Sequence, residues 1–347
     1  MKLLVTGSSG FVGRHVVEAA IRHGHQVCAM LRSRRDRTLP SWSNHPSVEL
    51  FDADLSDPTS LETLPAGIDG VIHLVASKSG DWDEAYRGTV ITTQNLLQAM
   101  EKAQLFRLTL ISSFSVYDYS HASDGSLLDE TWPMDNVPSQ RDAYAQTKII
   151  QEKLVREFAD RHPNEVAILR PGMIFGRDML WNACHGLGLG PVWLRIGNQE
   201  ILPLSYVENC AEAIIKATET PAARDQTLNI VDDILPSRQE YTQALQELTH
   251  AYSLVVPVNW SVMRNLASFA STVNNTLAQG KLKVPGLLTP SRLEARFKPL
   301  NFSNQRAKEC LEWQPRYSWR KALSRSYDQE LSLPLMRTSQ FNMKPDH

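Results

Sequence analysis

Short apolar runs alternate with longer amphipathic stretches along the first half of the chain. The apolar runs predict strands at residues 2–6, 26–31, 48–51, 70–75, 106–111 and 166–170. Helical patterns lie between these runs, most clearly at residues 83–103 and 141–161. Because alternating strands and helices form parallel sheets with helices on both faces, the pattern predicts an α/β fold with a Rossmann-type, doubly wound parallel sheet.

Three glycines, Gly7, Gly10 and Gly13, directly follow the first predicted strand and precede a helical pattern. Without side chains at the first two positions, a dinucleotide diphosphate can approach the backbone at the helix N-terminus, where unpaired N–H groups favour an anion. The third glycine permits close packing of the helix on the strand. An ordinary tight turn is the alternative, but the strand–turn–helix context favours a dinucleotide site.

Beyond residue 170 the regular alternation ends and the chain becomes richer in Trp, Gly and Pro. We therefore expect residues 1–170 to form the dinucleotide-binding domain and residues 171–333 to form mainly a smaller C-terminal substrate-binding part. A strand-like run at 227–231 indicates that residues 200–235 partly return to the first domain. Residues 334–347 are polar and are expected to form a tail.

The residues after the second predicted strand are basic, whereas an enzyme for an unphosphorylated ribose would place a carboxylate there. Arg32 and Arg35 suit a 2′-phosphate, because guanidinium groups form bidentate, charge-assisted bonds with phosphate. The sequence therefore favours NADP(H), with NAD(H) still possible, and a solvated basic loop is the alternative. After the third strand, the Asp54 carboxylate could accept a hydrogen bond from adenine. After the fourth, Val75 and Ala76 are small enough to let the cofactor pass.

Tyr144 and Lys148 lie four residues apart in the second helical stretch, so both side chains are expected on one helix face. A tyrosine ordinarily titrates near pH ~10, and a neighbouring ammonium lowers that pKa because it stabilises the phenolate. Ser113, after the fifth strand, could hydrogen-bond the same substrate oxygen. The three residues therefore predict an acid/base site, with a solvated helix face as the alternative. His73 is interpreted as a core histidine, because nothing in the sequence pairs with it.

The chain is close to neutral, with 36 basic and 38 acidic residues and a formal net charge of −2. This balance gives no electrostatic case for nucleic acid or an anionic membrane surface, so a small-molecule substrate is expected. The four cysteines contain no Cys-x-x-Cys pair, which argues against a zinc site or a disulfide framework, and no metal is predicted. Neither a membrane span nor a signal peptide is indicated, and a cytoplasmic location is expected.

These residues, together with ordered motifs over nearly the whole chain, resemble the extended short-chain dehydrogenase/reductase family. That family includes nucleotide-sugar epimerases and dehydratases, 3β-hydroxysteroid dehydrogenases and dihydroflavonol reductases. The motifs are Thr6-Gly7-x-x-Gly10-Phe-x-Gly13, Asp52-Ala-Asp54-Leu, His73-Leu-Val-Ala76, Ser112-Ser113-x-x-Val-Tyr117, Tyr144-x-x-x-Lys148, Arg170-Pro171-Gly172, Leu204-Ser-Tyr-Val207-Glu-Asn-Cys-Ala211 and Asn304-Gln-Arg-Ala-Lys308-x-x-Leu-x-Trp313-x-Pro315.

The resemblance implies a role for each matching residue. Tyr144 would be the general acid/base, Lys148 would lower its pKa and hold the nicotinamide ribose, and Ser113 would orient the reacting oxygen. The implied cofactor site comprises Gly7, Gly10, Phe11, Val12 and Gly13 as a cradle, Asp54 and Leu55 at the adenine, Val75 and Ala76 beneath the diphosphate, Lys78 on the diphosphate, and Pro171 near the nicotinamide. A homodimer through the two long helical stretches is also implied by the resemblance.

Two departures from the family pattern bear on the substrate. Met173 stands where sugar-nucleotide epimerases commonly carry an asparagine, and residues 200–204 offer no arginine for a substrate diphosphate. An apolar substrate is therefore favoured, with walls from residues 173–181 and 254–273. Core packing is the alternative for these residues, and three arginines could still form a phosphate clamp: Arg177, Arg195 and Arg238.

The leading hypothesis is an NADP(H)-dependent oxidoreductase that interconverts a secondary alcohol and a ketone, with Tyr144 as general acid/base and a moderately apolar or glycosyl-type substrate. A nucleotide-sugar epimerase or dehydratase that uses tightly bound NAD(P) is the first alternative. A cofactor-sensing or scaffolding protein on the same fold is the second. The presence of both Tyr144 and Lys148 favours an enzyme.

Overall fold

A computed structural model describes residues 1–32, 39–120, 122–181, 185–277 and 286–327. Its central sheet has seven strands in the order β12–β7–β5–β4–β1–β2–β3, and all neighbouring strands are parallel. These strands are β1 (Lys2–Thr6), β2 (Gln26–Leu31), β3 (Val48–Asp52), β4 (Gly70–His73), β5 (Leu108–Ile111), β7 (Val166–Pro171) and β12 (Thr227–Ile230). The predicted α/β class and Rossmann-type sheet are confirmed.

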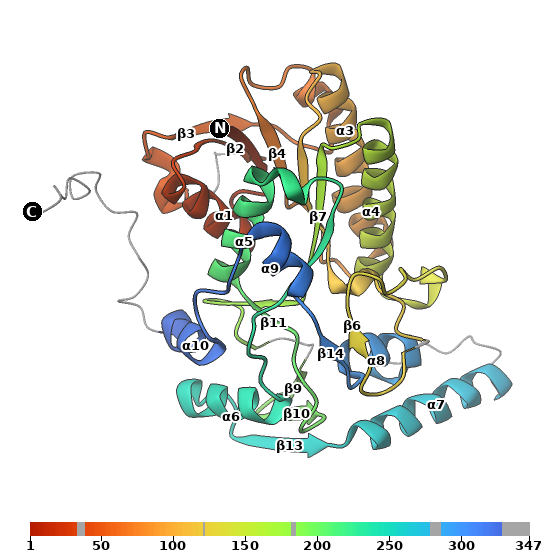
Figure 1. Ribbon diagram of the computed structural model, residues 1–347. Coiled ribbons are helices and arrows are strands. Elements are labelled where there is room, and N and C mark those ends of the chain that lie inside the picture. The colour runs from red at the N-terminus through yellow and green to blue at the C-terminus, as the bar shows by residue number, and fades with distance from the viewer. Residues whose placement is uncertain (33–38, 121, 182–184, 278–285, 328–347) are drawn as a thin grey trace, which may run out of the picture.

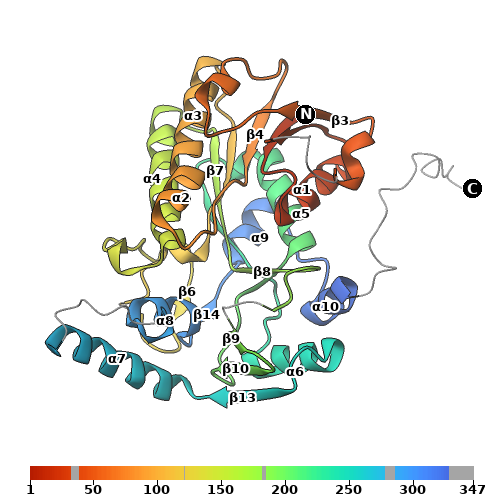
Figure 2. The ribbon, with the colours of Figure 1, turned by 180° about the vertical axis from the view of Figure 1, so that it is seen from behind.

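Helices cover both faces of the sheet (Figures 1 and 2). One face packs against α1 (Phe11–Arg22), α5 (Val207–Glu219) and α9 (Gln305–Leu311), and the other against α2 (Trp82–Tyr86), α3 (Thr92–Lys102) and α4 (Ala143–Arg161). Each face has its own apolar core of buried side chains from strands and helices. Because both faces are covered, the inner strands are buried runs without an alternating polar face, as is typical of parallel sheets, while the edge strand β3 carries exposed Glu49 and Asp52.

The strand order reverses at β1, since β2 and β3 lie on one side of it and β4, β5, β7 and β12 on the other. In open parallel sheets a ligand binds outside the carboxyl ends of the strands at such a reversal. The predicted strand-like run at 227–231 is observed as β12, which pairs with β7 at the edge of the sheet. That part of the chain therefore returns to the main sheet, while the division into two parts at residue 170 stays a prediction.

The remaining elements form a smaller assembly beyond the carboxyl ends of the strands (Figure 1). They are β6 (Leu127–Leu128), β8 (Met173–Phe175), β9 (Gly186–Leu189), β10 (Val192–Ile196), β11 (Leu204–Tyr206), β13 (Leu254–Val258), β14 (Asn301–Phe302), α6 (Arg238–Thr249), α7 (Trp260–Leu277), α8 (Pro290–Phe297) and α10 (Trp319–Tyr327). Short helical turns connect the elements: η1 (Ser41–Asn44), η2 (Pro58–Leu61), η4 (Phe114–Val116), η5 (Pro138–Gln140), η6 (Pro221–Ala223) and η7 (Gly286–Leu288). None of the helices in the described ranges combines the length and apolar content that a membrane span requires.

The helix predicted at 83–103 is not uniform, because a π-helical segment, η3 (Arg87–Ile91), separates α2 from α3. Gly88 in this segment lies against the loop after β4, where an added Cβ would lie 2.8 Å from the Cβ of Ser77. The Ser77 N–H also donates to Thr89 Oγ1 at 2.9 Å. The bulge therefore fits the helix against the strand-end loop, and single π turns of this kind often occur at functional sites.

Candidate active site

A groove of about 760 Å³ lies at the carboxyl ends of β1, β2, β3 and β4. Seven residues predicted to bind the cofactor line it together: Gly7, Gly10, Arg32, Asp54, Leu55, Val75 and Ala76. They come from four different strand ends that are far apart in the sequence. The fold therefore brings the predicted adenine, ribose and diphosphate contacts to one elongated groove, as the reversal of strand order requires.

The glycine turn at the head of the groove has the geometry that a diphosphate cradle needs. Gly7 has a φ of +68°, a conformation that side chains disfavour. A Cβ on Gly7 would lie 3.3 Å from Val75 Cγ2, and one on Gly13 would lie 2.1 Å from the Gly7 carbonyl oxygen. Gly10 is the N-cap of α1 and donates its N–H to the Gly7 oxygen at 3.0 Å. The backbone is thus open to a ligand at the helix N-terminus, and these residues fit a dinucleotide diphosphate.

The other predicted cofactor residues occupy different surroundings. Phe11 and Val12 form the first turn of α1 and pack partly into the apolar cores, while Gly13 is buried. Lys78 is exposed in the loop after β4 and does not line the groove, and Pro171 is buried at the end of β7. Arg35 lies outside the described residues. Of the two arginines predicted for a 2′-phosphate, Arg32 alone is therefore placed, and it faces the groove.

Sequence reasoning missed Arg87, which lines the groove from the π-helical segment beside Gly88 and Glu84. It provides a second guanidinium group along the groove, in addition to Arg32. A helical periodicity of 3.6 residues does not reveal a π bulge, so the direction of this side chain could not be predicted. Gly88 within a helical stretch was the available signal, because a glycine there often marks a close backbone approach.

Lys148, predicted to support the acid/base tyrosine, is 1% exposed on α4. Its Nζ donates to the carbonyl oxygen of Ile111 at 2.7 Å and also to Gln151 Oε1. Burial lowers the pKa of Lys148 to about 7, although the Glu152 carboxylate opposes that change. The ammonium is therefore held at the carboxyl end of β5, the strand that leads into Ser112 and Ser113.

Gln151 connects Lys148 to the groove. Its Nε2 donates to the carbonyl oxygen of Val75 at 3.1 Å and to Thr93 Oγ1 at 2.8 Å. Val75 lines the groove, so two hydrogen bonds through Gln151 join the predicted catalytic lysine to the groove wall. These hydrogen bonds fix the position of Lys148 relative to the end of β4. The sequence analysis did not identify Gln151 as a residue of the site.

His73 belongs to the same buried network, as the sequence indicated for a core histidine. Its Nδ1 lies 2.8 Å from Thr6 Oγ1 and its Nε2 lies 2.9 Å from Thr93 Oγ1. Burial, with a smaller contribution from the Lys148 charge, lowers the pKa of His73 to about 3. The ring is therefore neutral at physiological pH and links β1, β4 and α3.

Tyr144 and Ser113 come from elements that pack on one another. Tyr144 is half-buried in the first turn of α4, where the Asp142 carboxylate caps the helix by accepting from the Ala145 N–H at 2.9 Å. Ser113 is partly buried and caps η4, and its Oγ accepts from the Ser115 N–H at 3.1 Å. Since α4 packs against η4, the three predicted catalytic residues lie on two adjoining elements.

Behind these residues lies a buried ion pair between Glu152 and Arg170. The carboxylate accepts from Arg170 at 2.5 Å and 3.1 Å, from Ser112 Oγ at 2.5 Å and from Arg156 at 2.7 Å. Burial disfavours the charged form of Glu152, but the hydrogen bonds and charge of Arg170, supported by Ser112 and Arg156, outweigh it and hold the pKa below its ordinary value. The Arg170 guanidinium also stacks 4.5 Å above the Tyr117 ring. The pair therefore ties α4 to β7 and to the end of β5.

Of the two predicted apolar substrate walls, residues 173–181 are used largely for packing, whereas residues 254–273 expose several apolar side chains, with Phe269 69% exposed. Met173 and Phe175 are 5% and 0% exposed in the core of the smaller part. Trp181 is half-buried and packs edge-on against Trp193 and Tyr252. The alternative of core packing therefore holds for Met173 and Phe175.

The three arginines considered for a phosphate clamp have different contacts in the structure. Arg195 donates to Asn198 at 2.8 Å. Arg238 is buried above the Phe297 ring. Arg177 lines a different cavity, beside Arg14 on α1. They therefore do not form one clamp.

Replacing Lys148 by methionine is expected to flatten the dependence of stability on pH. Burial lowers the pKa of Lys148 from its ordinary value of 10.5 to about 7. Between these two pH values, the unfolded chain therefore binds one more proton than the folded protein. The free energy of unfolding of the wild type should therefore rise between pH 7 and 10, by up to about 4 kcal/mol from this group. Urea titrations at several pH values measure the slope, with Lys153→Met, an exposed position on the same helix, as control. Equal slopes for all three proteins would refute the assignment.

Fold and groove together define a dinucleotide-binding α/β protein. The family model described as the NAD dependent epimerase/dehydratase family matches residues 3–230 of this chain. The chain therefore belongs to that family, which is part of the extended short-chain dehydrogenase/reductases, and it is an enzyme of that family.

Similar proteins include reductases and dehydrogenases. The 2-alkyl-3-oxoalkanoate reductase of Stenotrophomonas maltophilia is 34% identical over 237 residues, which are 64% of this chain and 66% of that protein. The 3-beta-hydroxysteroid dehydrogenase of Mycolicibacterium neoaurum is 29% identical over 231 residues, 63% of this chain and 61% of that protein. The matches thus span less than two thirds of either relative. The UDP-glucose 4-epimerase of Thermus thermophilus, solved in complex with NAD, shares the fold with a TM-score of 0.65 and 18% identity over 93% of this chain and 96% of its own.

Proposed function

We propose that the protein is an NADP(H)-dependent oxidoreductase that interconverts a secondary alcohol and a ketone, with Tyr144 as the general acid/base. The observation that carries the proposal is the hydrogen-bonded path from Lys148 through Gln151 to Val75 in the groove wall. It couples the helix that carries Tyr144 to the place where the cofactor residues meet. A structural lysine could be placed anywhere in the core, whereas this one lies one helical turn from a half-buried tyrosine.

The bound nicotinamide cofactor supplies hydride transfer, and the side chains supply geometry and the proton. In the reductive direction, Tyr144 donates its phenolic proton to the substrate carbonyl oxygen, and the protonated form of Lys148 stabilises the resulting phenolate by opposite charge. The Ser113 hydroxyl donates a hydrogen bond to the same oxygen. Gly7 and Gly10 leave the backbone open to the diphosphate, and Arg32 pairs with a 2′-phosphate.

We place the substrate among moderately apolar alcohols and ketones. Two relatives support this class, since their names state the reduction of an oxoalkanoate and the dehydrogenation of a hydroxysteroid. Met173, at the position where epimerases commonly carry an asparagine, is buried in the core and offers no partner to a sugar diphosphate. A homodimer through α3 and α4 and a cytoplasmic location belong to the same proposal, on the strength of the resemblance and the composition.

Replacing Arg32 by serine is expected to weaken NADPH binding tenfold or more, about 1.4 kcal/mol, with little change for NADH. The reason is that a guanidinium interacts with the 2′-phosphate of NADPH, which NADH lacks. Fluorescence titration of the wild type and the variant with both cofactors, at one fixed salt concentration, measures this. Arg87→Ser is the matched control, because Arg87 lines the same groove and has no predicted preference for the 2′-phosphate.

Equal affinity of the wild type for the two cofactors would overturn the NADP(H) preference. Copurified and slowly released NAD would instead favour the nucleotide-sugar epimerase or dehydratase alternative, because such enzymes use the cofactor transiently. Turnover separates the two functions as well: a net oxidoreductase consumes one cofactor for each product formed, and an epimerase consumes none.

A further inference from the structure

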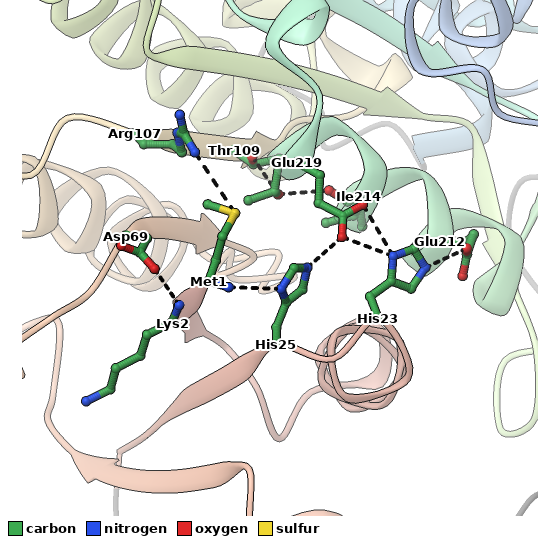
Figure 3. A network of polar contacts seen from close by, with 11 residues as sticks. Met1, Lys2, His23, His25, Asp69, Arg107, Thr109, Glu212, Ile214 and Glu219 are labelled. Carbon is green, nitrogen blue, oxygen red and sulfur yellow. Dashed lines mark hydrogen bonds and ion pairs between the residues drawn. The ribbon is translucent and has the colours of Figure 1, made fainter. Parts of the chain in front are cut away.

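A second group of polar side chains, seen from close by in Figure 3, lies at the amino end of β2, whereas the groove lies at the carboxyl ends of the strands. His23 and His25 lie in the turn between α1 and β2, and Glu219 is the last residue of α5. One donor atom from each of these three residues lies within 4.8 Å of the other two. The Glu219 carboxylate is 3.1 Å from His23 Nδ1 and 2.7 Å from His25 Nε2. Three metal-binding side chains therefore converge from two segments that are almost 200 residues apart.

We propose that His23, His25 and Glu219 bind a divalent transition-metal ion, with zinc as the best match. Zinc binds imidazole nitrogens and carboxylate oxygens at about 2.0–2.2 Å in a tetrahedron, so its ligand atoms lie roughly 3.4 Å apart. The observed separations of 2.7 Å, 3.1 Å and at most 4.8 Å bracket that value. Small side-chain movements would create the site, and a water molecule would complete the fourth position.

Glu212 adds the outer-sphere contact that histidine ligands in metal sites usually have. Its Oε1 lies 2.7 Å from His23 Nε2, the ring nitrogen that faces away from Glu219. A proton on Nε2, donated to Glu212, leaves Nδ1 available as a ligand. His25 is oriented similarly, with Nε2 toward Glu219 and Nδ1 3.4 Å from the Met1 nitrogen. Each imidazole thus presents one nitrogen to the same point.

Glu212 and Glu219 bring two carboxylates to the two imidazoles of the cluster. Two positive groups lie beside them: Arg22, 3.9 Å from Glu212, and the Met1 ammonium, 3.4 Å from His25 Nδ1. The cluster also lies at the carboxyl end of α5, where the helix dipole attracts positive charge.

The metal would clamp the turn between α1 and β2 onto α5. These two helices pack side by side on the same face of the sheet, and α1 carries the glycine turn at its other end. Because none of the ligands lines the cofactor groove, the site is structural and independent of the proposed reaction. This proposal departs from the sequence analysis, which predicted no metal from the absence of a Cys-x-x-Cys pair. That pattern detects thiolate ligands, and it does not detect histidine and carboxylate ligands from distant segments.

Zinc titration of untagged, chelator-treated and dialysed protein tests the proposal by calorimetry, with metal content measured by mass spectrometry. One zinc ion per chain is expected, together with a rise of several degrees in Tm. His23→Gln and His25→Gln should each weaken zinc binding by more than about 100-fold, and Glu212→Gln, which keeps all three ligands, by about 10-fold. His162→Gln is the matched control, because His162 lies 3.3 Å from Glu101 but does not belong to the three-ligand group found among the described residues.

Cobalt provides a second readout that does not depend on how well a variant folds. Cobalt(II) bound to His23, His25 and Glu219 of the wild type should show the intense visible absorption of a four-coordinate ion. Zinc binding below one ion per chain, a weak six-coordinate cobalt spectrum, or equal affinity of His25→Gln and His162→Gln would each overturn the site. In those cases the cluster is a hydrogen-bonded contact between α5 and the turn after α1.

Discussion

Replacing Tyr144 by phenylalanine is expected to lower kcat by about 10²–10⁴-fold while the affinity for NADPH stays nearly unchanged. The substitution removes the phenolic hydroxyl, which transfers the proton, and keeps the ring that packs in the first turn of α4. kcat and kcat/KM should fall by similar factors, because the hydroxyl of Tyr144 transfers its proton in the transition state. Steady-state kinetics with a ketone substrate, together with cofactor titration by fluorescence, measures both quantities.

Tyr119→Phe is the matched control for this experiment. Tyr119 is buried in the segment after β5, and its hydroxyl donates to the carbonyl oxygen of Phe114 at 2.9 Å. Losing that hydrogen bond should reduce stability by about 1 kcal/mol without removing a proton donor from the reaction. If Tyr144→Phe and Tyr119→Phe reduce kcat by the same factor, the role proposed for Tyr144 is wrong. A cofactor-sensing or scaffolding function would then account better for the geometry of the groove.

Replacing Glu152 by alanine is expected to cost about 3–5 kcal/mol of the free energy of unfolding. The side chain of Glu152 is 0% exposed, and the change leaves the buried Arg170 guanidinium without its counter-charge. It also removes the acceptor of the Ser112 hydroxyl, next to Ser113. Denaturant titration at pH 7 measures the loss, and the folded fraction of the variant should show weaker catalysis because the end of β5 is less well positioned.

Glu157→Ala, at a position further along α4, controls for the loss of a glutamate from this helix. It should change stability by less than about 0.5 kcal/mol.

The dependence of the free energy of unfolding on pH provides an independent check. Since the pKa of Glu152 is below its ordinary value in the folded protein, its contribution is present above the unfolded pKa and is lost as pH falls through the folded pKa. A Glu152→Ala protein as stable as Glu157→Ala would contradict this account of the buried pair.

The sequence alone determined the sheet and the head of the groove. All six strands of the alternating pattern, and the late strand at 227–231, are present in the structure within one to two residues at most ends. Strand position follows from short apolar runs, and the glycine turn follows from backbone freedom, so both are local properties of the chain. Residues directly after strands could be assigned to one groove, because parallel strands end at the same edge of the sheet.

Only the tertiary structure decided how these residues are connected. Lys148 depends on Gln151, which reaches back 76 residues to the Val75 carbonyl oxygen, and His23 meets Glu219 across 196 residues. The direction of Arg87 depends on a bulge that forms where Gly88 packs against Ser77. Contacts between segments that are distant in the sequence depend on how the helices pack on the sheet. The periodicity of side chains along the chain carries no information about which distant segments meet. The sequence therefore defined which chemical groups stand at the strand ends, and packing of α1, α4 and α5 on the sheet decided which of them interact.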